Sequence, residues 1–225
     1  MEYFKKAIVL FLKDLKIEFR TKEALNSMFV FGLLVFIVFN FAFDLTRIET
    51  LEIASGVLWI AFTFSGILGL NSSFSFEREN SAIEGIILAP VDRSAVYLGK
   101  LMSNFFLMLL FEIVLLPFFI IFFNLRIFSD LPVLFLVMIL GTLGFVTVGT
   151  IFSAISANTR MREIMLPVLL FPVSVPVIIG AVESTSFILL GNNQELLWSW
   201  IQRLFGIDII YFVASFLLFE YVIVE

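Results

Sequence analysis

The chain has 225 residues, of which 61% are hydrophobic and only 15% are charged, and its mean hydropathy is +1.09. Soluble domains carry about 25% charged residues, so this composition indicates a polytopic membrane protein. The net charge of −5 argues against a nucleic-acid partner. The sequence has no Cys, which excludes disulfide and thiol chemistry, and no His, the commonest metal and heme ligand and the commonest general base.

Residues 1–23 have the pattern of an amphipathic helix that lies on a membrane surface. At 100° per residue, one stripe collects Phe4, Ile8, Phe11, Leu12, Leu15 and Phe19. Outside this stripe lie Lys5, Lys6, Lys13, Lys16 and Arg20. A basic polar face beside a Phe- and Leu-rich face is typical of an interfacial helix. A helix that faces a partner or solvent is the alternative, because Val9, Leu10 and Ile17 depart from the stripe.

Six apolar segments are long enough to cross the hydrocarbon core, which requires about twenty residues. The predicted spans are 24–43, 53–74, 97–123, 131–157, 164–182 and 204–224. The last span is the weakest, because Asp208 and Glu220 interrupt it. The longest loop is expected at 183–206, with a turn at Asn192 and Asn193, followed by Trp residues that suit the headgroup level.

The distribution of positive charge predicts the orientation. Eleven of the 14 Lys and Arg residues fall in the N-terminal segment, the 75–100 loop and the 158–163 loop. The other three loops carry only Arg47, Arg126 and Arg203. Because positive charge is enriched in cytoplasmic loops, both termini are predicted to be cytoplasmic.

The largest charged segment between spans, residues 76–93, predicts a short amphipathic helix. Ser81 and Glu84 have capping-box spacing, and Pro90 should end the helix. Its apolar face would carry Ile83, Ile86 and Ile87. Asp92 is placed to cap the next span. The segment is either an ordinary interfacial loop helix or a docking element for a soluble partner.

The third span contains polar residues within the bilayer. Glu112 follows Lys100 by twelve residues, or about 18 Å of helix. An ionisable group at that depth is costly and should face the protein interior or a cavity. Glu112 therefore either belongs to a substrate pathway or relay, or is a structural carboxyl that is protonated or paired with a hydroxyl or amide on another span. Asn104 is a second pathway candidate on the same span.

The fourth and fifth spans carry packing and backbone signals. Gly149, Ser153 and Ala157 recur every four residues and predict a helix-packing stripe, and Thr150 and Ser156 are candidates for hydrogen bonds across helices. The fifth span contains Pro167, Pro172 and Pro176. Each proline removes an intrahelical hydrogen bond, so a kinked or partly unwound helix is expected. Such a helix either lines a transport site or is simply kinked.

No catalytic constellation or metal-ligand cluster emerges from the sequence, and Gly99-Lys100 lacks the spacing of a phosphate-binding loop. Six stretches, in order, resemble the cytochrome c maturation family CcmB, also called heme exporter protein B. They are DLKIEFR (14–20), GVLWIA (56–61), FERE (76–79), LAPVDR (88–93), GTLG (141–144) and REIMLP (162–167). The resemblance covers nearly the whole chain and is least distinct over the last forty residues or so.

The resemblance implies the permease subunit of an ABC-type complex with the type-2 exporter fold, located in the bacterial inner membrane. The segment after the second span would then be the coupling helix that docks on an ATPase subunit. The coupling residues would be Glu77, Arg78, Glu79, Ile83, Glu84, Ile86, Ile87, Pro90, Asp92 and Arg93. Implied partners are a CcmA-like ATPase, CcmC-like and CcmD-like membrane subunits, a CcmE-like heme chaperone and a second copy of this chain.

In this interpretation the chain is not an enzyme. The partner binds ATP, and the complex handles heme for c-type cytochrome biogenesis. The chain is expected to hold no cofactor itself, because among the usual axial heme ligands it offers only Met and Tyr. Two alternatives stay open: a type-2 exporter permease for a lipid, drug or polysaccharide, and a membrane assembly subunit that transports nothing.

Overall fold

The computed structural model describes residues 2–42, 47–79, 92–125, 127, 130–157, 159, 161–191 and 193–222. Within these residues the chain forms seven α-helices and no strand. The helices are α1 (Glu2–Thr21), α2 (Glu23–Ala42), α3 (Arg47–Glu79), α5 (Arg93–Phe122), α6 (Leu131–Ala157), α7 (Arg162–Leu190) and α8 (Gln194–Val222). All except α1 are long and apolar enough to cross a membrane. The prediction of an all-helical protein with six spans is confirmed.

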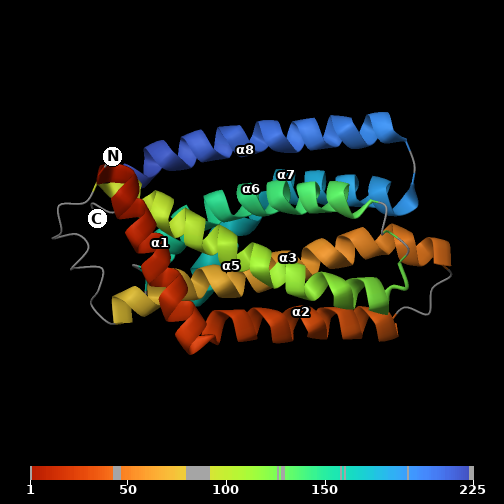
Figure 1. Ribbon diagram of the computed structural model, residues 1–225, viewed down its shortest axis with the longest axis horizontal. Helices are drawn as coiled ribbons and strands as arrows, with labels where there is room; N and C mark the ends of the chain where they lie inside the picture. Colours follow the sequence, from red (N-terminus) through yellow and green to blue (C-terminus); the bar gives the residue numbers. More distant parts are fainter. Residues whose placement is uncertain are drawn as a thin grey trace.

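The spanning helices run side by side, and α1 crosses them obliquely at one end of the bundle (Figure 1). The N-terminus and the last turns of α8 lie at this same end. α1 packs mainly on α5. Most of its predicted apolar stripe faces away from the bundle, because Phe4, Ile8 and Leu12 are exposed, although the Phe11 ring packs on Phe106 of α5. The predicted amphipathic helix is present, with its apolar side free to contact lipid.

α6 is the central helix and packs against α3, α5, α7 and α8. It carries no charged residue, and its small side chains let neighbouring helices approach closely. The predicted stripe packs on α3, where Ser153 Oγ donates a hydrogen bond to the Leu70 carbonyl at 2.5 Å. Asn104 of α5 donates to Thr150 Oγ1 across the helices, as predicted. The prediction for Ser156 is wrong, because its hydroxyl donates to the Ser153 carbonyl within α6.

The predicted long loop at 183–206 is wrong, and so are the limits of the last two spans. α7 continues to Leu190, and α8 already begins at Gln194. The polar residues Ser184 and Thr185 do not stop α7, because each hydroxyl donates to the carbonyl four residues earlier, at 2.7 and 2.8 Å. The helix ends instead at Gly191, whose φ of 65° provides a left-handed C-cap. The Trp residues of this segment therefore lie in α8.

The three prolines of the fifth span do not unwind it. α7 is one helix from Arg162 to Leu190 and contains all three. A proline has no backbone N–H, so the carbonyl four residues earlier, which for Pro176 is that of Pro172, loses its usual donor. Just before Pro176, the Val173 carbonyl accepts a hydrogen bond from the Tyr211 hydroxyl of α8 at 2.6 Å. Within one turn of Pro176, α8 therefore adds a hydrogen bond to the backbone of α7.

Candidate functional site

The predicted coupling segment begins where α3 ends and finishes where α5 begins. Its central residues 80–91, including Ile83, Glu84, Ile86, Ile87 and Pro90, lie outside the described residues. Glu77, Arg78 and Glu79 form the last turn of α3. Asp92 occupies the N-cap position of α5 as predicted, but its side chain makes no capping hydrogen bond. Arg93 donates to the Glu220 carbonyl at 3.2 Å, which ties the start of α5 to the end of α8.

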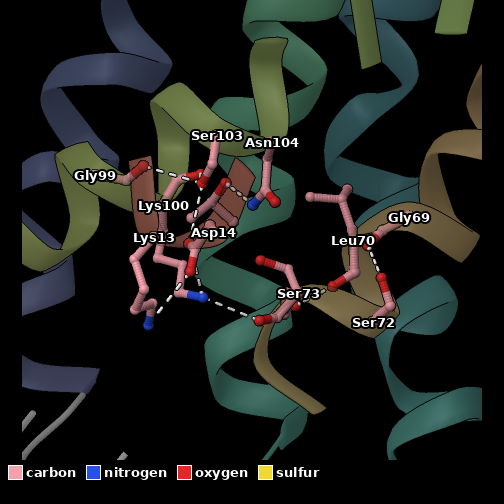
Figure 2. Close-up of polar contacts among 12 residues, drawn as sticks. Lys13, Asp14, Gly69, Leu70, Ser72, Ser73, Gly99, Lys100, Ser103 and Asn104 are labelled. Atoms are coloured by element: carbon pink, nitrogen blue, oxygen red, sulfur yellow. Dashed lines mark hydrogen bonds and ion pairs between the residues drawn. The ribbon is translucent and has the colours of Figure 1, made fainter. Parts of the chain in front are cut away.

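A buried ion pair joins α1 to α5, and its lysine also binds α3 (Figure 2). Lys100 of α5 is only 1% exposed. Its Nζ lies 3.0 Å from Asp14 Oδ2 of α1 and donates to the Ser73 carbonyl of α3, also at 3.0 Å. Asp14 also accepts from Ser103 Oγ at 3.2 Å and lies 3.3 Å from Lys13 Nζ. A buried ammonium group requires such partners, so Lys100 fixes the relative positions of the three helices.

The helix crossing that permits this pair depends on Gly99. A Cβ at this position would lie 2.9 Å from the Ala7 carbonyl oxygen and 2.8 Å from Leu10 Cβ. Real Cβ atoms essentially never approach other atoms so closely, so any side chain at position 99 would push α1 away from α5. The contact also explains why Leu10 departs from the outward stripe of α1: it faces the bundle.

A cavity of about 80 Å³ lies beside the ion pair, between α1, α2, α3, α5 and α6. Its polar lining comes from Asp14, Glu18, Thr21, Glu23, Ser72, Ser73, Ser103 and Asn104. Glu18 Oε1 accepts from the Leu25 backbone N–H at 2.9 Å and so caps the start of α2. The structure therefore places Asn104 in this cavity near the end of the bundle.

Glu112 is fully buried in the seam between α5 and α6. The Thr142 hydroxyl donates to Glu112 Oε1 at 2.7 Å. The second oxygen, Oε2, has no hydrogen-bond partner among the residues that the structure describes. Of the arrangements expected from the sequence, pairing with a hydroxyl on another span is the one observed.

The five predicted pathway residues do not line one passage. Asn104 borders the cavity under α1, whereas Glu112 lies two turns further along α5 in contact with Thr142. On α7, Pro172 and Pro176 are exposed on the outside of the bundle, and Pro167 is half-buried. Pro172 and Pro176 therefore face lipid or a partner subunit rather than the interior of the chain.

A further buried carboxyl escaped the sequence analysis. Asp208 of α8 is 3% exposed and lies over Gly144 of α6. In the sequence it was interpreted only as an interruption of the last span. The missed signal was a single acidic residue at the middle of a long apolar segment, where an ionisable group usually has a role.

The fold and the buried polar contacts define a multi-pass helical membrane protein with an amphipathic helix packed across one end. The sequence model of the family described as CcmB protein matches residues 5–220. The chain therefore belongs to the CcmB family. It is 24% identical over 193 residues to heme exporter protein B of Pseudomonas aeruginosa, covering 84% of this chain and 86% of the relative.

Two further relatives have the same name. Heme exporter protein B of Rhodobacter capsulatus is 25% identical over 171 residues, which is 76% of this chain and 78% of that protein. The Escherichia coli K12 protein is 26% identical over 95 residues, covering 42% of this chain and 43% of the relative.

Proposed function

We propose that this chain is the permease subunit of an ABC-type heme exporter complex that supports c-type cytochrome biogenesis. A separate CcmA-like subunit binds and hydrolyses ATP. The complex lies in the bacterial inner membrane, with both termini of this chain cytoplasmic. Family membership and the relatives named heme exporter protein B support heme as the cargo of the complex. The contact of Lys100 with Asp14 and Ser73 is the structural observation that supports mechanical coupling.

The coupling argument follows from the position of Lys100. α3 leads directly into residues 80–91, and α5 leads directly out of them. A force on this segment therefore acts on the ends of both helices. Because Lys100 binds α1 and α3 together, the three elements move as one unit, and α1 carries the motion across the end of the bundle. Asn104 and Thr150 extend the same polar contacts into the central helix α6.

The coupling segment is proposed to dock on the ATPase through its isoleucines. Buried aliphatic anchors contribute more binding energy than charges at the rim of an interface. Ile83→Arg and Ile87→Arg should each abolish co-purification of the ATPase, while the chain still inserts into the membrane. Glu84→Gln is the matched control in the same segment and should retain the ATPase. Normal complex formation with both arginine variants would contradict the docking role.

The proposed complex further contains CcmC-like and CcmD-like membrane subunits, a second copy of this chain and a CcmE-like heme chaperone. In this proposal heme is held by a partner, and this chain converts ATP-driven motion into a rearrangement of that partner. The sequence supports this proposal because it has neither His nor Cys, which are common axial ligands of heme iron. Affinity purification from native membranes, with identification of the co-purifying subunits, tests the assembly as a whole.

A further inference from the structure

Asp208 occupies the middle of the membrane-spanning helix α8, equidistant from Gln194 and Val222. Each end is about 21 Å away along the helix, so the carboxyl lies deep in the hydrocarbon region. It is 3% exposed, and neither of its oxygens has a hydrogen-bond partner in the described part of the chain. An unpaired ionised carboxylate is strongly disfavoured in such surroundings.

The carboxyl group fits a crevice that the neighbouring helices leave for it. A Cβ on residue 144 of α6 would overlap Asp208 Oδ1 and would lie 3.0 Å from Val177 Cγ2 of α7. Only a glycine at position 144 leaves room for this side chain. α8 therefore seats its carboxyl between α6 and α7, the two helices against which it packs most extensively.

No charged group of the described residues neutralises Asp208 in this position. α6 carries no titratable residue. On α7 the titratable residue nearest to Val177 along the helix is Glu183, and on α8 the Arg203 guanidinium stacks on Trp200, 4.6 Å from the ring centroid. Tyr211 donates its hydroxyl to the Val173 carbonyl. On α5, Tyr97 donates to the Thr147 carbonyl and Glu112 accepts from Thr142.

The seam beyond Asp208 contains further hydroxyl groups. Thr147, one turn from Gly144 on α6, is fully buried, and its Oγ1 has no partner among the described residues. The Tyr97 hydroxyl lies 3.1 Å from the Thr147 carbonyl, and Ser215 of α8 is buried beside Tyr97. Tyr97 belongs to the second turn of α5, so these hydroxyls extend from the carboxyl toward the end of the bundle where α1 lies.

We propose that Asp208 is a proton-binding site and that its protonation determines whether α8 packs closely against α6 and α7. A carboxylate and a hydronium ion give a carboxylic acid and water, with no other reactant. The neutral acid is compatible with the crevice beside Gly144 and Val177. The ionised form requires water or a cation, so it favours an arrangement in which α8 separates from α7. The proposal is independent of the cargo and of the partner subunits.

The rate of disulfide formation between α7 and α8 can measure how closely the two helices pack. The native chain has no Cys that would interfere. A Cβ at Gly180 would lie 3.6 Å from Leu204 Cβ, within the range for a disulfide. The full chain carrying Gly180→Cys and Leu204→Cys is reconstituted in lipid nanodiscs. The initial rate of oxidant-induced cross-linking is then recorded against pH, with and without Asp208→Asn. The pH dependence that comes from thiolate formation is the same in both proteins. The ratio of their rates therefore reports only the effect of the Asp208 carboxyl.

With Asp208 present, the cross-linking rate relative to the Asp208→Asn protein should fall as pH rises, by up to tenfold per pH unit for one linked proton. Glu112→Gln, which alters the other buried carboxyl, should leave this dependence in place. Superimposable profiles for Asp208 and Asp208→Asn would overturn the proposal, as would loss of the pH dependence in Glu112→Gln.

A second measurement requires no change at Asp208. In the Glu112→Gln chain, the infrared carbonyl band of the buried protonated carboxyl should lose intensity as pH is raised. A band that stays constant while the protein remains folded would also overturn the proposal. The same band should be absent from the Asp208→Asn, Glu112→Gln double variant.

Discussion

The hydrogen bond between Thr142 and Glu112 allows a quantitative test of how the interior of this bundle is stabilised. Thr142→Val keeps the shape of the side chain but removes the hydroxyl that lies 2.7 Å from Glu112 Oε1. Since Oε2 already has no partner among the described residues, the variant leaves a fully buried carboxyl without any donor. The relevant energy is therefore the penalty for an unsatisfied buried group, not the smaller net value of an exchanged hydrogen bond.

That penalty is about 1–3 kcal/mol in proteins generally. Hydrogen bonds between spanning helices average about 0.6 kcal/mol and reach about 1.7, because the unfolded chain in the membrane also finds partners. Complete burial places this bond at the upper end of the membrane range. We therefore expect Thr142→Val to lower the free energy of unfolding by about 1–2 kcal/mol, a factor of roughly 5–30 in the ratio of folded to unfolded protein.

The measurement is detergent-induced unfolding in mixed micelles, followed by the fluorescence of Trp59. This side chain is buried and donates to Thr185 Oγ1 at 2.9 Å, so its emission reports the contact between α3 and α7. The other two Trp residues, Trp198 and Trp200, are replaced by Phe in every protein compared.

The matched control uses Glu112→Met, which removes the group that needs the hydroxyl. In that background Thr142→Val should cost less than about 0.5 kcal/mol, because the hydroxyl then serves no buried carboxyl. An equal cost of Thr142→Val in both backgrounds would refute the assignment of the bond.

Three further predictions address the interfacial helix, the orientation and heme. Gly99→Ala should displace α1 and raise the labelling rate of a cysteine placed at the buried Ala7 at least tenfold. Gly56→Ala, where an added Cβ meets nothing within 4 Å, should not, and equal rates would refute the close crossing. Single cysteines at Ser81 and Asn192 should react with an impermeant reagent from opposite sides of the membrane, and reaction from one side only would overturn the topology. After heme addition and desalting, the purified chain should show no stoichiometric Soret absorbance, whereas a complex with the CcmC-like partner should. A saturable one-to-one signal lost on replacing one Tyr or Met would place the heme site in this chain.

The sequence determined the features that depend on the local properties of the chain. Six apolar runs of sufficient length require six helices, because backbone polar groups in lipid must be satisfied within the segment. α6 was predicted from Leu131 to Ala157 without error, since charged or polar loop residues flank it on both sides. The outward stripe of α1 was predicted because residues three and four apart share a helix face. Family membership was likewise evident from short stretches distributed along the chain.

The predicted limits of α7 and α8 were wrong because a charged residue lowers the local hydropathy but does not by itself end a helix. Glu183, just past the predicted end of the fifth span, and Arg203, just before the predicted start of the last span, lower the local hydropathy, but α7 and α8 continue through these positions. Helix ends depend instead on backbone conformation, here the positive φ of Gly191. The sequence contained that glycine, yet a glycine alone does not distinguish a helix end from a packing position.

Only the tertiary structure decided which buried polar groups meet. Ser103 and Asp14 are 89 positions apart, and Glu112 and Thr142 are 30 apart, so no spacing rule connects them. The angle at which α1 crosses α5, made possible by Gly99, brings Asp14 to Lys100. In the same way, the rotation of α8 about its own axis turns Asp208 toward Gly144 rather than toward lipid. Crossing angles and rotations arise from the packing of complete helix surfaces, and a one-dimensional pattern does not specify them.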